Sequence, residues 1–117
     1  MMMRRTVLAA ALAALLGSTT VMAHHGWSSY LDKPMTVDGV ITASTYANPH
    51  GTVKLEVQGK VWDVVLAPTS RMQSRGLTEP MLVKGTTARV VGYQHREVAS
   101  EMRAERITIG DKTVELR

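Results

Sequence analysis

The chain has 117 residues, a formal net charge of +4 at neutral pH and no cysteine. Without cysteine it can form no disulfide, and it offers neither a thiolate nucleophile nor a thiolate metal ligand. Aromatic residues make up 4% of the chain, with no phenylalanine. Because binding of single-stranded nucleic acid needs stacking aromatics in a strongly basic groove, we expect no nucleic-acid partner.

Residues 1–23 are typical of a secretory signal peptide. Arg4 and Arg5 precede a short apolar run at residues 7–16, and small side chains at Val21 and Ala23 favour cleavage before His24. A membrane-spanning helix needs about twenty apolar residues, more than this run supplies. We therefore expect export to the periplasm, removal of the leader and no stable membrane anchor afterwards.

The expected mature protein, residues 24–117, is short enough to be one domain. Cleavage would remove Arg4 and Arg5, two of the 14 basic residues, and leave only a weak positive charge. Residues 24–34 are polar and aromatic and end in Pro34, which predicts an N-terminal arm before the first strand.

Residues 35–46 are rich in β-branched side chains with a rough period of two, which predicts a long first strand. Gly39 within this strand indicates a bulge or a sharp bend. The turn residues Asn48, Pro49 and Gly51 follow. Residues 52–57 and 61–66 then alternate cleanly, and the sequence Gln-Gly-Lys between them is typical of a hairpin turn.

The period changes after the third strand. Residues 68–76 predict one short helix, with Thr69 or Ser70 as its N-cap and Gly76 as its stop. Pro80 prevents a long helix in the connection at residues 77–84.

The rest of the chain returns to strands. Residues 86–93 and 101–109 predict two strands, separated by a polar loop at 94–100. In the second of these strands, Ile107 and Ile109 are expected on one face. A turn then leads into a short last strand at residues 113–116.

This order predicts an all-β fold with one short helix, an OB-fold-like barrel of five to six strands after the signal peptide. The features that favour it are a long, bent first strand and a helix between the third and fourth strands. Closing the sheet also removes the exposed edges of a small β domain. The alternative is a small open β-sandwich or meander.

Several short motifs occur in an order that resembles the motif order of the DUF6152 family of small exported bacterial proteins. They are His24-His25-Gly26-Trp27, Val37-Asp38-Gly39-Val40, Asn48-Pro49-His50, Arg75-Gly76-Leu77, Lys84-Gly85, Gly92 and Arg106-Ile107-Thr108. The resemblance covers nearly the whole mature chain and implies an exported, compact protein. It implies no chemistry. The loop at residues 94–100 departs from the pattern, because it lacks a turn rich in glycine and proline.

The four histidines suggest a metal site. His24 and His25 would open the mature chain, His50 lies in the loop after the first strand, and His95 lies in the loop at 94–100. In an OB barrel these two loops flank one end of the binding face. We therefore expect His50 and His95 to come together, with the N-terminus beside them.

Copper is the ion that this set of nitrogen ligands favours, and zinc is less favoured. The α-amine and Nδ1 of His24 can chelate one ion, and one further imidazole would complete a T-shaped site. His25 offers a second mode through the amine, a deprotonated amide and its imidazole. A third-position histidine would require retention of Ala23.

Plainer interpretations remain open. The histidine doublet is also compatible with a solvated chain end, His50 with a turn cap and His95 with a solvated loop. Trp27 and Trp62 are expected to be packing residues. The sequence contains neither a nucleophile elbow nor a phosphate-binding glycine loop, so we expect no enzyme. The hypothesis is copper carriage or sequestration, and the alternative is a non-metal envelope module that binds a small ligand or a partner protein.

Overall fold

The computed structural model describes residues 26–117. The predicted signal peptide at residues 1–23 and the predicted metal ligands His24 and His25 lie outside these described residues. None of the helices in the described part is long and apolar enough to cross a membrane.

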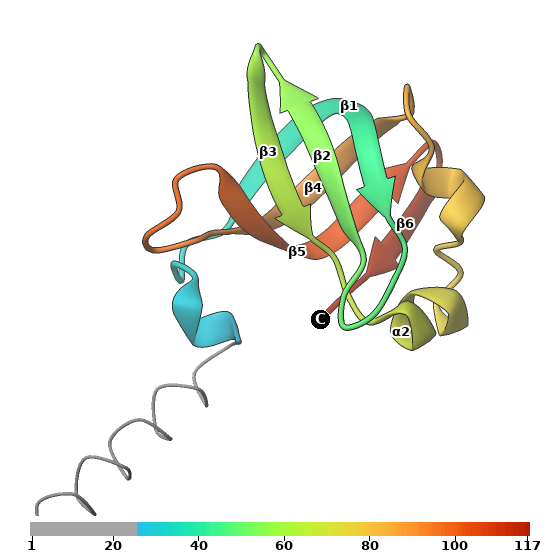
Figure 1. The fold of residues 1–117 in the computed structure, drawn as a ribbon, viewed down its shortest axis with the longest axis horizontal. Coiled ribbons are helices and arrows are strands. Elements are labelled where there is room, and N and C mark those ends of the chain that lie inside the picture. Colours follow the sequence, from blue (N-terminus) through green and yellow to red (C-terminus); the bar gives the residue numbers. More distant parts are fainter. Residues whose placement is uncertain (1–25) are drawn as a thin grey trace, which may run out of the picture.

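Six strands and three short helical segments make up residues 26–117 (Figure 1). The strands are β1 (Met35–Thr45), β2 (Thr52–Val57), β3 (Lys60–Val65), β4 (Thr87–Gln94), β5 (Glu101–Ile109) and β6 (Lys112–Glu115). The helical segments are the 3-10 turn η1 (Trp27–Ser29), the α-helix α2 (Thr69–Ser74) and the 3-10 turn η2 (Glu79–Leu82).

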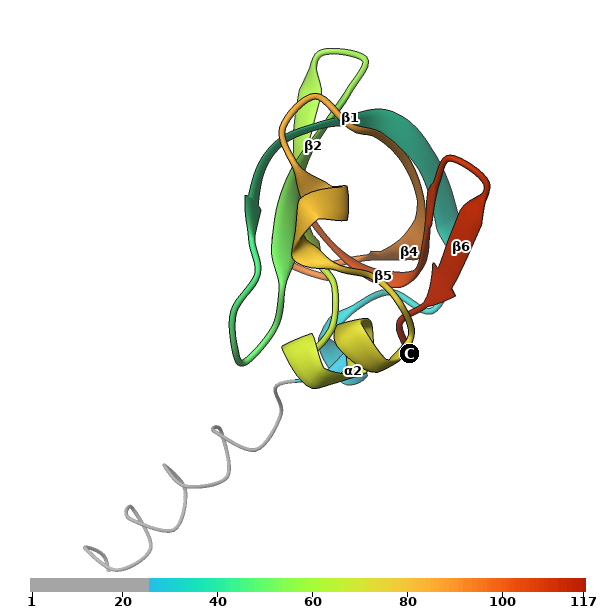
Figure 2. The same ribbon diagram turned by 90° about the vertical axis from the view of Figure 1, so that its right-hand side faces the viewer.

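The first five strands form a closed barrel, and β6 adds an extra strand beside β5. The strand order is β3-β2-β1-β4-β5-β6, and a parallel pairing between β3 and β5 closes the sheet. Figure 2 shows the resulting ring of strands. This closure confirms the predicted OB-like barrel and excludes the open sandwich or meander.

The barrel interior is filled by the side chains that the period-two pattern predicts. Val53 and Leu55 of β2 and Trp62 and Val64 of β3 are buried, while Lys54 between them in β2 is exposed. Helix α2 contributes Met72, which is fully buried. Because burying one such side chain contributes roughly 1.5–3 kcal/mol, this core can hold the domain together without disulfides.

Two local predictions, a bulge at Gly39 and a side-chain N-cap from Thr69 or Ser70, were wrong. The irregularity in β1 lies between Ile41 and Ala43, where its register with β2 shifts. Gly39 instead marks a close approach, since a Cβ at this position would overlap the backbone oxygen of Glu56. The N-cap of α2 is Pro68 without a side-chain cap, and the Thr69 hydroxyl donates to Asn48 Oδ1 over 2.8 Å.

A bulge changes which side chains of β5 face the interior. Ala104 pairs with Gly92 and Arg106 pairs with Val91, so Glu105 is the extra residue. The buried residues therefore step from Met102 and Ala104 to Ile107, which breaks the alternation. The sequence-based prediction placed Ile107 and Ile109 on one face. Ile107 is buried and Ile109 is partly buried against the core, and the prediction did not foresee this change of phase.

The N-terminal arm is fixed against the loop between β4 and β5. Backbone hydrogen bonds join Leu31 N to Gln94 O over 2.8 Å and Arg96 N to Ser29 O over 2.9 Å. Tyr30 and His95 form an isolated antiparallel bridge between these bonds. The arm thus lies beside the β4–β5 loop, at one end of the barrel (Figure 1).

Candidate ligand-binding cleft

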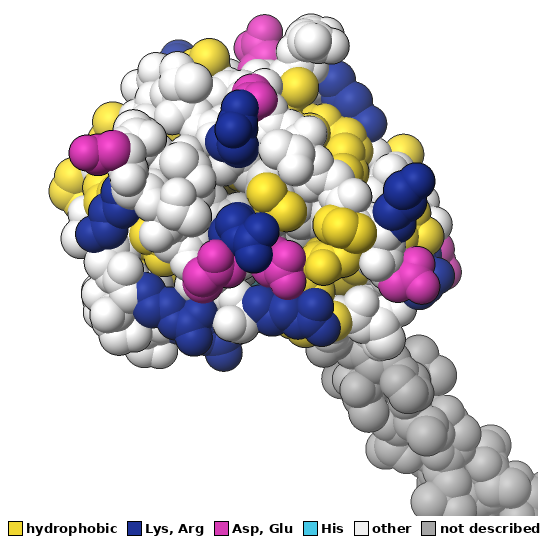
Figure 3. Space-filling view, turned by 180° about the vertical axis from the view of Figure 1, so that it is seen from behind, with side chains coloured by type: hydrophobic (Ala, Val, Ile, Leu, Met, Phe, Trp, Pro, Cys, Tyr) yellow, Lys and Arg dark blue, Asp and Glu magenta, His cyan; other side chains and the backbone are white. Residues whose placement is uncertain are grey.

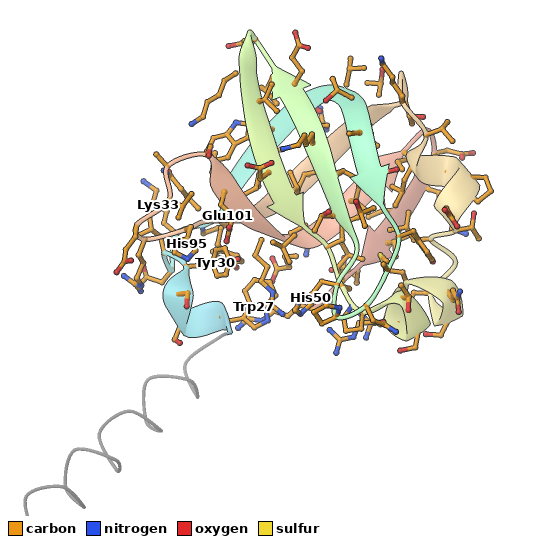
Figure 4. All side chains as sticks on the ribbon, in the orientation of Figure 1. Trp27, Tyr30, Lys33, His50, His95 and Glu101 are labelled. Atoms are coloured by element: carbon orange, nitrogen blue, oxygen red, sulfur yellow. The ribbon has the colours of Figure 1, made fainter. Side chains whose placement is uncertain are left out.

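A cleft of about 460 Å³ lies between the N-terminal arm and the barrel. Its lining includes Gly26, Trp27 and Tyr30 of the arm, His50 of the β1–β2 loop, His95 of the β4–β5 loop, and Glu101 and Arg103 of β5. The structure therefore brings His50 and His95 to one cleft, as the barrel topology predicts. In Figure 4, Trp27 lies between His50 and the group formed by Tyr30, His95 and Glu101.

His50 is half-buried and has no hydrogen-bond partner among residues 26–117. Burial lowers the pKa of its imidazole below the ordinary value, and the positive charges of Arg103 and Arg71 lower it further. A lowered pKa keeps the ring neutral near pH 7, with a lone pair on one nitrogen. This is the form of histidine that binds a metal ion.

His95 holds the β4–β5 loop in shape. Its Nδ1 accepts hydrogen bonds from the backbone amides of Glu97 and Val98, each over 3.1 Å. A neutral ring that accepts at Nδ1 carries its proton on Nε2, which lies 3.9 Å from Glu101 Oε2. Since neither nitrogen then offers a free lone pair, this arrangement argues against His95 as a metal ligand.

Tyr30 and Glu101 join the arm to β5. The buried phenol of Tyr30 donates to Glu101 Oε2 over 2.6 Å, and its ring packs edge-on against His95 with centroids 5.1 Å apart. Burial raises the pKa of Tyr30 well above its usual range, and the bond to Glu101 and that carboxylate's charge raise it further. The phenol therefore stays protonated and keeps the bond at neutral pH.

Trp27 forms an aromatic wall of the cleft and packs against its neighbours, as the sequence predicts, although it is not one of the core residues. The guanidinium carbons of Arg103 and Arg117 lie 4.5 Å and 4.4 Å from its ring centroid, and Tyr93 packs edge-on against it at 5.7 Å. Trp62, by contrast, is buried in the barrel as predicted.

Sequence patterns did not point to Arg103, Tyr30 or Glu101. Arg103 lies in β5 between the buried residues Met102 and Ala104, so alternation alone could have placed it on the outer face. Nothing in the pattern relates it to Trp27, which is 76 positions earlier in the chain.

Among the described residues, no three His, Cys, Asp or Glu side chains gather as a metal-binding group. Gly26, the first described residue, itself lines the cleft.

A second cavity, of about 210 Å³, lies over β1, β2 and β3. Its lining is mostly small and aliphatic, with Lys54 and Asp63 joined as an ion pair at 2.7 Å. On the face seen in Figure 3, acidic and basic side chains are interspersed, and no histidine of the described part is visible. The cleft beside the arm is the stronger candidate for a site, because both described histidines line it and neither lines the second cavity.

The fold and the cleft together define a small OB-like β-barrel protein with a cleft between its N-terminal arm and the barrel. The chain belongs to the DUF6152 family, described as a family of unknown function, whose model matches residues 11–103. This membership confirms the resemblance noted from the sequence. A comparison with curated proteins found no match.

Proposed function

We propose that the protein is an exported copper carrier or copper-sequestering protein of the periplasm and not an enzyme. The ligands in this proposal are the α-amine and Nδ1 of His24, exposed by removal of the signal peptide, and the imidazole of His50. The observation that carries the proposal is that Gly26 and His50 line the same cleft. Only one residue separates Gly26 from His24.

The chemistry of His50 supports this proposal. Its ring is unpaired among the described residues, and its lowered pKa favours the neutral form that a metal requires. An amine and two imidazoles suit Cu(II), which also leads the divalent ions in affinity for nitrogen ligands. We leave His95 out of the ligand set, because its Nδ1 is occupied by the loop amides.

The test is Cu(II) titration of protein that has been exported and processed in cells. Mass spectrometry first establishes that the chain begins at His24. Calorimetry with a competing chelator then gives the affinity, and electron paramagnetic resonance reports the nitrogen ligands. We expect one tightly bound ion per chain. One extra N-terminal residue, or His50→Ala, should each weaken binding at least tenfold, about 1.4 kcal/mol.

His95→Asn is the matched control, and it should leave the copper affinity unchanged. Equal affinity in the extended protein would overturn the role of the His24 amine, and an unaffected His50→Ala variant would overturn the role of His50. Turnover of oxygen or peroxide by the copper-loaded protein would contradict carriage or sequestration.

A second candidate function is a non-metal binding module in the cell envelope that binds a small ligand or a partner protein through the same cleft. Trp27 lines the cleft, and the guanidinium groups of Arg103 and Arg117 lie over its ring. This lining favours the second function, because an indole and guanidinium groups suit an organic ligand better than a bare cation. Weak copper binding in both the processed and the extended protein would favour this function.

A further inference from the structure

Among the charged side chains that line the cleft, Arg103 has the fewest hydrogen-bond partners. Its Nε atom is buried and has no hydrogen-bond partner among residues 26–117. Leaving a buried donor unpaired costs roughly 1–3 kcal/mol, and more when the group is charged. A protein tolerates such a donor more readily where a bound group can accept from it.

The electrostatic surroundings of Arg103 are positive. Burial lowers the pKa of its guanidinium, the neighbouring Tyr30 raises it, and the charges of Arg71 and Arg117 lower it. Arg71 donates to the backbone oxygen of Leu116 over 3.0 Å, and no carboxylate side chain among residues 26–117 forms an ion pair with it. Arg117 has Glu105 as its nearest carboxylate, at 3.9 Å, and its side chain is about half exposed.

Arg71, Arg103 and Arg117 form a positive cluster. Glu101, the carboxylate that lines the cleft, does not neutralise it. Glu101 accepts the short hydrogen bond from Tyr30 and lies 3.9 Å from His95 Nε2. The guanidinium groups of Arg103 and Arg117 instead lie over the ring of Trp27. The cleft thus combines a positive cluster, an unpaired N–H donor and an aromatic wall.

We propose that this cleft binds the oxyanion group of a small organic acid, with Arg103 as the principal donor and Trp27 as the ring that holds the Arg103 guanidinium at the cleft wall. A planar guanidinium offers two parallel N–H donors to a carboxylate or phosphate. Arg117 and Arg71 add positive charge. A cleft of about 460 Å³ lies within the usual size range of small-molecule sites.

This site does not depend on copper. The test therefore uses metal-free protein with one extra N-terminal residue, in which the proposed chelate cannot form. Benzoate, acetate and inorganic phosphate are titrated separately, in a buffer without other oxyanions. The readouts are the Arg103 Nε–H signal in proton–nitrogen NMR spectra and the fluorescence of Trp27, measured in a Trp62→Phe background.

We expect the Arg103 Nε–H signal to move downfield and saturate. Benzoate should bind at least threefold more tightly than acetate, because its ring can pack against the apolar lining of the cleft, which includes Tyr30 and Val65. Arg103→Gln and Arg103→Lys should each weaken binding at least tenfold. Arg89→Gln is the matched control and should have no effect, since Arg89 is exposed and paired with Asp38 over 2.8 Å.

Saturable binding of phosphate alone, lost in Arg103→Gln, would also support the oxyanion site and would assign it to phosphate-bearing ligands. No saturable change with any of the three anions would overturn the proposal, as would equal binding by folded Arg103→Gln protein. Unfolding curves of each variant verify that it is folded. A failure here would leave the copper proposal standing, because copper binding is measured on the processed chain with His50→Ala.

Discussion

The phenol of Tyr30 donates a 2.6 Å hydrogen bond to Glu101 Oε2, although the two residues are 71 positions apart. This bond joins the N-terminal arm to the first residue of β5. It also places the Tyr30 ring edge-on against His95, at 5.1 Å between centroids. The arm, the β4–β5 loop and β5 therefore meet at one side of the cleft.

Removal of this bond should loosen the arm. Tyr30→Phe keeps the ring but leaves Glu101 without its donor, and we expect a loss of about 1–3 kcal/mol of unfolding free energy. Urea denaturation gives this value, and amide hydrogen exchange at Leu31 and Arg96 reports the arm directly. Tyr93→Phe is the control, because no hydrogen bond from the Tyr93 hydroxyl is described. Equal stability of the two variants would contradict the role of the bond.

Stability should also fall in alkaline solution. Burial, and then Glu101, raise the pKa of Tyr30 in the folded protein above the ordinary value of 10.0. Between that value and the raised one, the unfolded chain loses the phenolic proton while the folded chain keeps it, so rising pH favours unfolding. The contribution is fully present below pH 10. Urea midpoints measured from pH 8 to 11 should decline, and less steeply in Tyr30→Phe.

The stability of the Tyr30→Phe variant should still decline somewhat at alkaline pH, because burial also raises the pKa of Tyr46. An identical slope in the wild-type protein and Tyr30→Phe would show that Tyr30 ionises normally, against the expectation from its burial.

We expect His95 to stabilise the β4–β5 loop and not to bind a metal ion. His95→Ala removes the acceptor of the Glu97 and Val98 amides, so we expect a loss of about 1–2 kcal/mol. His95→Asn should recover part of this loss, because its side-chain oxygen can accept in place of Nδ1. Urea denaturation and the amide shifts of residues 97 and 98 measure both effects. Copper affinity that fell in His95→Asn while stability did not would show that His95 is a metal ligand.

Local chemistry made most of the barrel predictable. The clean alternation in β2 and β3 follows from side chains that point to opposite faces of a strand. The tight turn between them follows from Gln58 and Gly59, both of which have positive φ. Proline, glycine and polar residues mark the ends of the other strands and of the short helix. Each of them restricts the backbone conformation of only a few neighbouring positions.

The candidate site was predictable only in part. OB-like topology, inferred from the order of elements, correctly placed His50 and His95 at one cleft. It could not assign the Nδ1 of His95 to the loop amides, because that depends on the conformation of the loop at 94–100. The ligand role proposed for His24 and His25 is still a prediction, since both residues lie outside the described part of the chain.

The sequence by itself determined the order of the strands and the place of the short helix, since alternation, turn residues and helix stops are short-range signals that each act on their own segment. Closure of the barrel required the pairing of β3 with β5, which lie far apart in the chain. Tertiary structure decided the bulge at Glu105, the packing of Arg103 and Arg117 over Trp27, and the bond from Tyr30 to Glu101. These features depend on the register between strands and on residues far apart in the chain. No periodicity encodes such contacts, and they form only when closure of the sheet brings the arm and β5 together.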